Sequence, residues 1–208
     1  MSDLLMTLLS VASIWIVAVI TPGPNFLLTL QTTLSHSRQH ALYGVVGIAI
    51  GTALWGSAGF LGIALLFQAA PWLYVGVKVV GGGYLIYLGI RLLWSSYHPA
   101  PQQTSRTVTN GGRWAMLRIG LWTNLSNPKS ALFVSSLFAS TLSQTPSLGQ
   151  GIATIAIMTT LSFSWYALVA LLFSTPRITQ LYQQAKQRID RMAGVLFIGF
   201  GSLLASQR

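Results

Sequence analysis

Two short stretches of this sequence place prolines and polar residues inside long apolar segments. The first is ITPGPNFL, residues 20–27, and the second is NLSNPKSALF, residues 124–133. Proline removes a backbone donor and clashes with the preceding turn, at a cost of about 3 kcal/mol in a helix interior. A helix surrounded by lipid has no water to repair that loss. These two stretches are therefore the first places to look for chemistry.

Each stretch pairs a small polar residue with a proline, as Thr21-Pro22 and as Asn127-Pro128. A polar residue suits the N-cap of a helix, and proline suits the first helical position, where its missing N–H would have been unpaired anyway. The same prolines leave upstream carbonyls without partners, including that of Asn124. We therefore predict two half-helix N-termini with free N–H groups, each lying beside freed carbonyl oxygens.

This combination of groups suits the two ends of a zwitterionic amino acid, because helix N-termini attract a carboxylate and carbonyl oxygens attract an ammonium group. Interrupted helices at corresponding positions of two halves point to the substrate site of a transporter. The alternative is a pair of proline kinks that only shape helix packing. The predicted substrate-binding residues are Thr21, Pro22, Gly23, Pro24, Asn25, Asn124, Asn127, Pro128 and Lys129.

Lys129 lies deep in its apolar segment, where a lysine costs about 2.5–3.5 kcal/mol on insertion scales. As a cation at the start of a helix it also opposes the helix dipole. The two acidic residues, Asp3 and Asp190, lie at the ends of the predicted spans. We therefore predict that the substrate carboxylate is the partner of Lys129. The alternative is a lysine that is neutral without substrate, because burial disfavours the charged amine, and that carries a proton in an antiporter.

The elements that hold these residues are predicted to be membrane helices. The 208 residues are 52% hydrophobic and 7% charged, whereas soluble domains are about 25% charged. A span needs about 20 apolar residues. The sequence contains six such segments, at 4–32, 41–67, 71–94, 114–142, 148–173 and 190–206. We predict an all-α protein with one transmembrane domain over residues 1–208, in which the first and fourth helices are interrupted.

Basic residues predict the orientation of these helices. Lys and Arg concentrate between spans one and two, three and four, and five and six, whereas the connections 68–70 and 143–147 contain none. By the positive-inside rule, both termini lie outside and the three basic connections face the cytoplasm. The net charge of +10 is then a topology signal and does not indicate a nucleic-acid partner.

A polar connector divides the chain into two halves of three spans, residues 1–97 and 113–208, joined by a cytoplasmic linker at 98–112. Because each half has an odd number of spans, the halves are predicted to be inverted repeats. The basic segment 177–192 has helical periodicity and is predicted to be an interfacial helix. A solvated hairpin is an equally good interpretation of that segment.

Other functional classes have less support. The chain has no cysteine, which excludes thiol chemistry, and its histidines fall in or beside loops. No acid pair or metal-binding motif lies within a span, so we predict no enzyme activity, no metal and no cofactor. A channel for small solutes or anions remains the alternative, because Lys129 suits an anion path. The sequence leaves open whether the protein forms a homodimer.

At TPGPN and NLSNPKSALF the chain resembles the LysE/RhtB superfamily of bacterial amino-acid exporters, especially its homoserine/threonine-resistance branch. The similarity continues through SRQHALYGVVGIAIG, GGGYLIYLGIRLL and RIDRMAGVLFIGFGSLL. The resemblance implies a six-span inner-membrane exporter of small neutral amino acids, threonine-like, homoserine-like or leucine-like, driven by the proton gradient. Relatives often carry an aspartate directly after PGP, where this chain has Asn25, so the resemblance does not supply the coupling group.

Overall fold

A computed structural model describes residues 2–69, 71–97, 112–141 and 147–206. All the regular structure within these residues is helical. The eight helices are α1 (Ser2–Ile20), α2 (Pro24–Ser35), α3 (Arg38–Ala69), α4 (Pro71–Tyr97), α5 (Arg113–Leu125), α6 (Pro128–Thr141), α7 (Leu148–Leu172) and α8 (Pro176–Ser206). The predicted linker at 98–112 lies outside the described residues except for Gly112.

The helix bounds follow the predicted apolar segments. α3 and α4 cover the segments 41–67 and 71–94, and α7 covers the segment 148–173 except for its last residue. The segment 4–32 is divided into α1 and α2, which are bent by 53° at their break. The segment 114–142 is likewise divided into α5 and α6. Both predicted interruptions are therefore present.

The last helix differs from its prediction. α8 is unbroken from Pro176 to Ser206, so residues 177–192 are neither a separate interfacial helix nor a hairpin. They form the first half of the helix that contains the predicted span 190–206. No Pro or Gly interrupts 177–192, and the apolar side of this half packs, through Ile178 and Tyr182, against the cluster around Phe26 and Phe173.

The distribution of side chains is that of a membrane protein. Leu54 and Val195 on the outside of the bundle are 50% and 62% exposed, whereas Asn124 and Ser162 inside it are buried. Soluble proteins show the opposite arrangement. Among the described residues, α3 and α7 are each long and apolar enough to cross a membrane, and α1 with α2 is a third if the bent pair is one span. The protein is thus a helical membrane protein.

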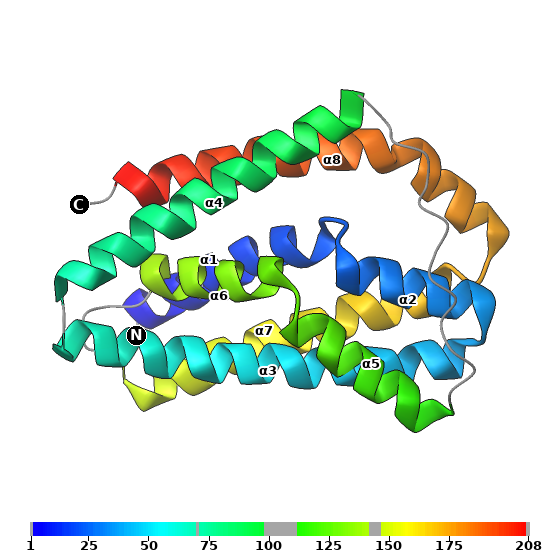
Figure 1. The fold of residues 1–208 in the computed structure, drawn as a ribbon, viewed down its shortest axis with the longest axis horizontal. Helices are drawn as coiled ribbons and strands as arrows, with labels where there is room; N and C mark the ends of the chain where they lie inside the picture. The colour runs from blue at the N-terminus through cyan, green and yellow to red at the C-terminus, as the bar shows by residue number, and fades with distance from the viewer. Residues whose placement is uncertain (1, 70, 98–111, 142–146, 207–208) are drawn as a thin grey trace.

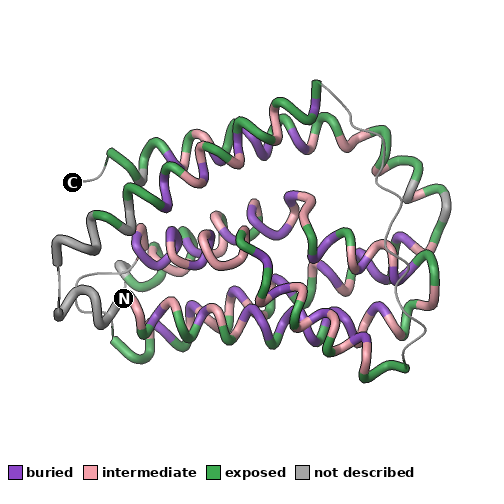
Figure 2. Tube along the Cα trace, viewed as in Figure 1, coloured by how far each residue is buried: buried purple, intermediate pink, exposed green. Residues whose placement is uncertain are grey.

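The helices pack in pairs around a common centre. α4 lies along α8, and α3 lies along both α5 and α7 (Figure 1). Glycines let α4 and α8 approach closely, because a Cβ on Gly89 would lie 2.6 Å from the carbonyl oxygen of Gly194. Such small-residue contacts are typical of helix pairs in membranes. Figure 2 shows buried positions along α1 and α6 in the middle of the bundle and exposed positions on the outer sides of α4 and α8.

The starts of α3, α5 and α8 and the end of α4 lie at one end of the molecule (Figure 1). The N- and C-terminal ends of the chain lie at the other end. Basic residues lie at or near these helix ends: Arg38 starts α3, Arg91 lies in the last turns of α4, Arg113 starts α5, and Arg177 lies at the start of α8. The fold therefore gathers the predicted cytoplasmic charges at one end of the bundle.

Candidate functional site

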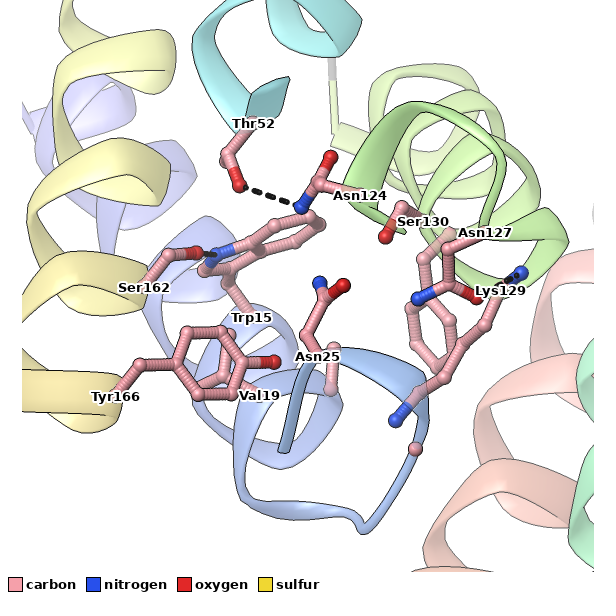
Figure 3. Close-up of a pocket in the computed structure, with 13 residues that line it drawn as sticks. Trp15, Val19, Asn25, Thr52, Asn124, Asn127, Lys129, Ser130, Ser162 and Tyr166 are labelled. Carbon is pink, nitrogen blue, oxygen red and sulfur yellow. Dashed lines mark hydrogen bonds between the residues drawn. The ribbon is translucent and has the colours of Figure 1, made fainter. Parts of the chain in front are cut away.

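The two helix breaks meet in the middle of the bundle. α1 packs against α6 and α2 packs against α5, which brings the four half-helix ends together between α3 and α7. A cavity lies at this point (Figure 3), lined by Trp15, Ala18, Val19, Gly23, Asn25, Thr52, Asn124, Asn127, Lys129, Ser130, Phe133, Ser162 and Tyr166. Five of the predicted site residues therefore line one cavity, although they come from opposite halves of the chain.

The second break has the predicted local structure. α6 begins at Pro128, and the Oδ1 atom of Asn127 accepts a hydrogen bond from the backbone N–H of Lys129 at 3.0 Å. This is the N-cap arrangement, in which a side-chain oxygen satisfies one of the free N–H groups of the first turn. The cap also fixes the start of the helix that carries Lys129 into the cavity.

The first break differs from its prediction by two residues. α2 begins at Pro24 with Gly23 as its N-cap and no side-chain cap, so the assignment of Thr21 as N-cap and Pro22 as first helical residue is wrong. Instead, the Thr21 hydroxyl donates to the Val17 carbonyl at 2.7 Å and closes α1. A residue before proline is disfavoured in the helical region. Pro24 therefore keeps Gly23 extended, at φ −165° and ψ −172°.

Two amide oxygens in the cavity have no hydrogen-bond partner among the described residues. They are Oδ1 of Asn25 and Oδ1 of Asn124, and both side chains are buried. The amide nitrogen of Asn124 is used, because it donates to the Thr52 hydroxyl at 3.2 Å. Figure 3 shows Asn25 pointing into the centre of the cavity, toward the Asn124 side of the site. Buried acceptors without partners are costly, so these oxygens are suited to receive donors from a ligand.

Backbone carbonyls at the two breaks have different roles. The freed carbonyl of Asn124 accepts the indole N–H of Trp55 at 3.2 Å and the backbone N–H of Asn127 at 3.2 Å. Its predicted availability to a substrate is therefore wrong, because protein donors already occupy it. The carbonyl of Thr21 accepts the Lys129 ammonium, with Nζ at 2.8 Å. This hydrogen bond joins the first break to the second.

Asp190, which the sequence predicts at a membrane boundary, is a buried charge within the bundle. Asp190 is 1% exposed within α8, and its Oδ2 atom lies 2.6 Å from Nζ of Lys186. Its other oxygen has no partner among the described residues. Asp190 also acts electrostatically on Lys129. The prediction that only a substrate carboxylate can compensate Lys129 is thus too strict, because α8 packs this carboxylate inside the bundle.

Sequence reasoning missed the walls of the cavity. Trp15 comes from α1 and donates from Nε1 to the Ser162 hydroxyl of α7 at 2.9 Å, and the Tyr166 hydroxyl points toward Asn25 (Figure 3). Single hydroxyl and aromatic residues in apolar helices have no spacing that marks them as ligand contacts. Conversely, Thr21, Pro22, Pro24 and Pro128 shape the breaks, and their side chains do not line the cavity.

The cavity is small and lies between two apolar clusters. Its volume of about 20 Å³ is enough for about one water molecule. On one side it is bounded by a cluster that includes Trp15, Val19 and Phe133, and on the other by a cluster that includes Phe26 and Tyr166. The polar cavity therefore lies between two apolar clusters and has no room for an amino acid.

Comparison with known proteins agrees with this arrangement. The family described as LysE type translocator matches residues 16–208. The threonine efflux protein of Salmonella typhi is 34% identical over 208 residues, which cover 99% of this chain and 100% of that protein. The threonine efflux protein of Escherichia coli (strain K12) is 35% identical over 211 residues, with the same coverage. The leucine efflux protein of Enterobacter sp. (strain 638) is 31% identical over 199 residues, covering 90% of each chain. No solved structure matches the chain significantly.

Proposed function

This chain belongs to the LysE type translocator family, and from that premise we propose that it exports small neutral amino acids across a bacterial inner membrane. Relatives similar over their full length are named threonine efflux proteins, and a more distant one is named a leucine efflux protein. Threonine-like and homoserine-like amino acids are the first substrates to test, followed by leucine. Both termini lie on the outer side in this proposal, as the distribution of basic residues predicts.

The observation that carries this function is the set of groups around the cavity. Lys129 supplies a cation for a carboxylate, whereas Oδ1 of Asn25 and Oδ1 of Asn124 are acceptors without partners. In the closed structure Lys129 bonds to the Thr21 carbonyl. In a zwitterion bound between them, the carboxylate would pair with Lys129. The ammonium would donate hydrogen bonds to the Thr21 carbonyl and to the two amide oxygens. Each protein group that loses its partner would gain one from the substrate.

The same cavity favours a neutral side chain on the substrate. The described residues that line it include no carboxylate, and the nearby Asp190 already pairs with Lys186 and faces the charge of Lys129. A second ammonium group on lysine or ornithine would add one more cation beside Lys129 and is therefore disfavoured. Ala18, Val19 and Phe133 provide apolar contacts, and Ser130 and Ser162 provide hydroxyls. A short side chain that is aliphatic or carries one hydroxyl fits this lining.

We place transport in an alternating-access cycle of two inverted repeats. In the proposed repeat, α1, α2 and α3 of the first half correspond to α5, α6 and α7 of the second. Helix packing supports this correspondence, because the α1–α7 contact has its counterpart in the α5–α3 contact. The α1–α6 contact likewise has its counterpart in the α5–α2 contact. α4 and α8, the third helix of each half, pack on each other. A cavity with room for about one water must open to admit an amino acid, which supports a cycle with a closed intermediate. Proton coupling is part of the proposal, because Lys129 and Asp190 can each exchange a proton.

Exchange in proteoliposomes tests this function. Labelled threonine is expected to exchange with unlabelled threonine, homoserine or leucine, and lysine is expected to exchange poorly. Threonine methyl ester and N-acetylthreonine each lack one charge of the zwitterion. A charge-assisted hydrogen bond is worth about 1.5–3 kcal/mol, so each should compete at least about tenfold less well than threonine.

The same vesicles distinguish the alternatives. Faster exchange of lysine or arginine than of threonine or leucine would contradict the electrostatic argument for a neutral substrate. A conductance measured in planar bilayers without counter-transport would instead indicate a channel for small solutes or anions. Vesicles without protein supply the leak rate for each compound.

Two asparagine variants separate substrate binding from helix capping. Asn25→Ala removes an oxygen that has no partner and a side-chain hydrogen bond with Tyr166. We expect a smaller loss of thermal stability than the loss of a helix cap would cause, and a rise in KM of about fivefold to tenfold, from a loss of about 1 kcal/mol. Asn127→Ala removes the cap of α6 and should cost about 1 kcal/mol of stability. Thermal unfolding in detergent and transport KM measure the two effects. Equal destabilisation by both variants would show that Asn25 has a structural role.

A further inference from the structure

A second, larger cavity lies on the outer side of the candidate site. Its volume is about 400 Å³, which is within the range of about 300–1,000 Å³ for small-molecule sites. The lining residues come from α1, α4, α6 and α8 and are Met6, Leu9, Ser10, Ser13, Ile14, Leu85, Phe133, Ser136, Leu137, Ser140, Thr141, Phe200 and Leu203. We call it the outer cavity, because the predicted topology places the start of α1 and the end of α6 outside.

Phe133 is the one described residue shared by the two linings. Its side chain is 2% exposed, and its ring packs on the ring of Phe197 with centroids 4.8 Å apart. On the other side, Nζ of Lys129 lies 6.0 Å from the Phe133 centroid. The ring therefore stands between the cation of the candidate site and the outer cavity.

One face of α6 connects the two cavities. Lys129, Phe133, Ser136 and Ser140 follow one another at intervals of four, three and four residues, which places them on the same side of a helix. Eleven residues at 1.5 Å each extend over about 16 Å. A molecule that leaves Lys129 along this face must pass Phe133 before it reaches the serines.

The hydroxyl oxygens of the outer cavity can accept hydrogen bonds from a ligand. Ser10 and Ser13 of α1 donate to the carbonyls of Met6 and Leu9, at 2.9 and 2.8 Å. Ser136, Ser140 and Thr141 of α6 likewise donate within their own helix. Each hydroxyl hydrogen is used, whereas each oxygen keeps acceptor capacity. Five acceptors in a mostly apolar cavity suit the ammonium group and the short side chain of a neutral amino acid.

We propose that the outer cavity is the exit vestibule of the transporter and that Phe133 is the gate between it and the candidate site. This inference rests on the proposed export function for the identity of the cargo, and the accessibility test below does not depend on the cargo. Displacement of the Phe133 ring joins the two cavities. The amino acid then moves from Lys129 to the hydroxyls of α1 and α6.

Cysteine accessibility tests the gate directly, because the natural chain contains no cysteine and each introduced thiol is the only one. Ser140→Cys reports the outer cavity and Ser130→Cys reports the candidate site. In intact cells, a membrane-impermeant thiol reagent is expected to label Ser140→Cys and to leave Ser130→Cys protected. Combining Ser130→Cys with Phe133→Ala should remove that protection.

Two controls keep the result specific. Phe138→Ala removes an equally buried aromatic ring of α6 that lines neither cavity, so it should leave Ser130→Cys protected. Phe133→Leu retains bulk at the gate and should also preserve protection. The proposal is overturned if Ser140→Cys is labelled only from the cytoplasmic side, or if Phe133→Ala and Phe138→Ala have the same effect on Ser130→Cys. If proteoliposomes do not exchange amino acids but Ser130→Cys is still protected by Phe133, the proposed substrate is wrong and the gate stands.

Discussion

Lys129→Gln is expected to reduce amino-acid export to the level of cells that lack the protein. Lys129 is the only cation among the described residues that line the candidate site. Glutamine can still donate a hydrogen bond to the Thr21 carbonyl, but it offers no charge to a carboxylate. Loss of a charge-assisted hydrogen bond costs about 1.5–3 kcal/mol, which corresponds to about a tenfold to hundredfold loss of affinity. Export of threonine from preloaded cells and threonine exchange in proteoliposomes measure the effect.

The protein level should not fall in this variant. A lysine within a span costs about 2.5–3.5 kcal/mol on insertion scales, so replacing it with a neutral residue does not disfavour insertion. Arg188→Gln is the matched control, because it removes one positive charge from an exposed position on α8. Undiminished export by Lys129→Gln at equal protein level would remove Lys129 from the site and leave the fold unaffected.

The Lys129–Thr21 hydrogen bond gives a physical link between binding and conformational change. It joins the first break to the second in this structure, in which the cavity has no room for an amino acid. In the proposed site, a substrate carboxylate that attracts Lys129 would weaken this link, and the substrate ammonium would replace Lys129 at the Thr21 carbonyl. A ligand shifts a conformational equilibrium only through contacts that differ between the two states. The exchange of partners at Lys129 is such a difference.

Much of the fold could be predicted because bilayer and backbone impose simple rules. Apolar segments of sufficient length predict the helices, and the bounds of α3, α4 and α7 agree with them. Proline predicts the breaks, because its missing donor and its ring exclude a regular helix at Pro22 and Pro128. The exact start of α2 could not be predicted from the cap pattern alone. Pro22 and Pro24 both suit a first helical position, and the restriction on Gly23 decides between them.

The site was only partly predictable for a different reason. Asn25 and Lys129 directly follow prolines, and Asn124 lies four residues before Pro128, so the sequence marks all three. Thr52 and Ser162 resemble the other hydroxyl residues of α3 and α7, and only the packing of those helices brings them to the cavity. Asp190 lies where a polar connector meets an apolar segment in the sequence. Its burial follows from the continuity of α8, which no local pattern revealed.

Gly120→Ala is expected to destabilise the protein strongly. α5 crosses α3 so closely that a Cβ on Gly120 would overlap the carbonyl group of Gly44, with the carbonyl carbon 2.8 Å away. Both partners are backbone, so no flexible side chain can move aside. Overpacking costs about 1–3 kcal/mol and more where the backbone must shift. We expect a marked fall in melting temperature in detergent and weaker threonine exchange, because separating α5 from α3 also pulls Asn124 from Thr52.

Gly83→Ala is the matched control, and we expect it to leave the stability of the protein unchanged or to raise it. Gly83 is exposed on α4, and no atom lies within 4 Å of the place a Cβ would take. Alanine in an exposed helix position is favoured over glycine by about 0.5–1 kcal/mol, so this variant should be as stable as the parent or more stable. The same methyl group thus changes the sign of its effect with the distance to the next helix. If Gly120→Ala proved as stable as Gly83→Ala, the close crossing of α3 and α5 would be wrong, and with it the position of Asn124 in the site.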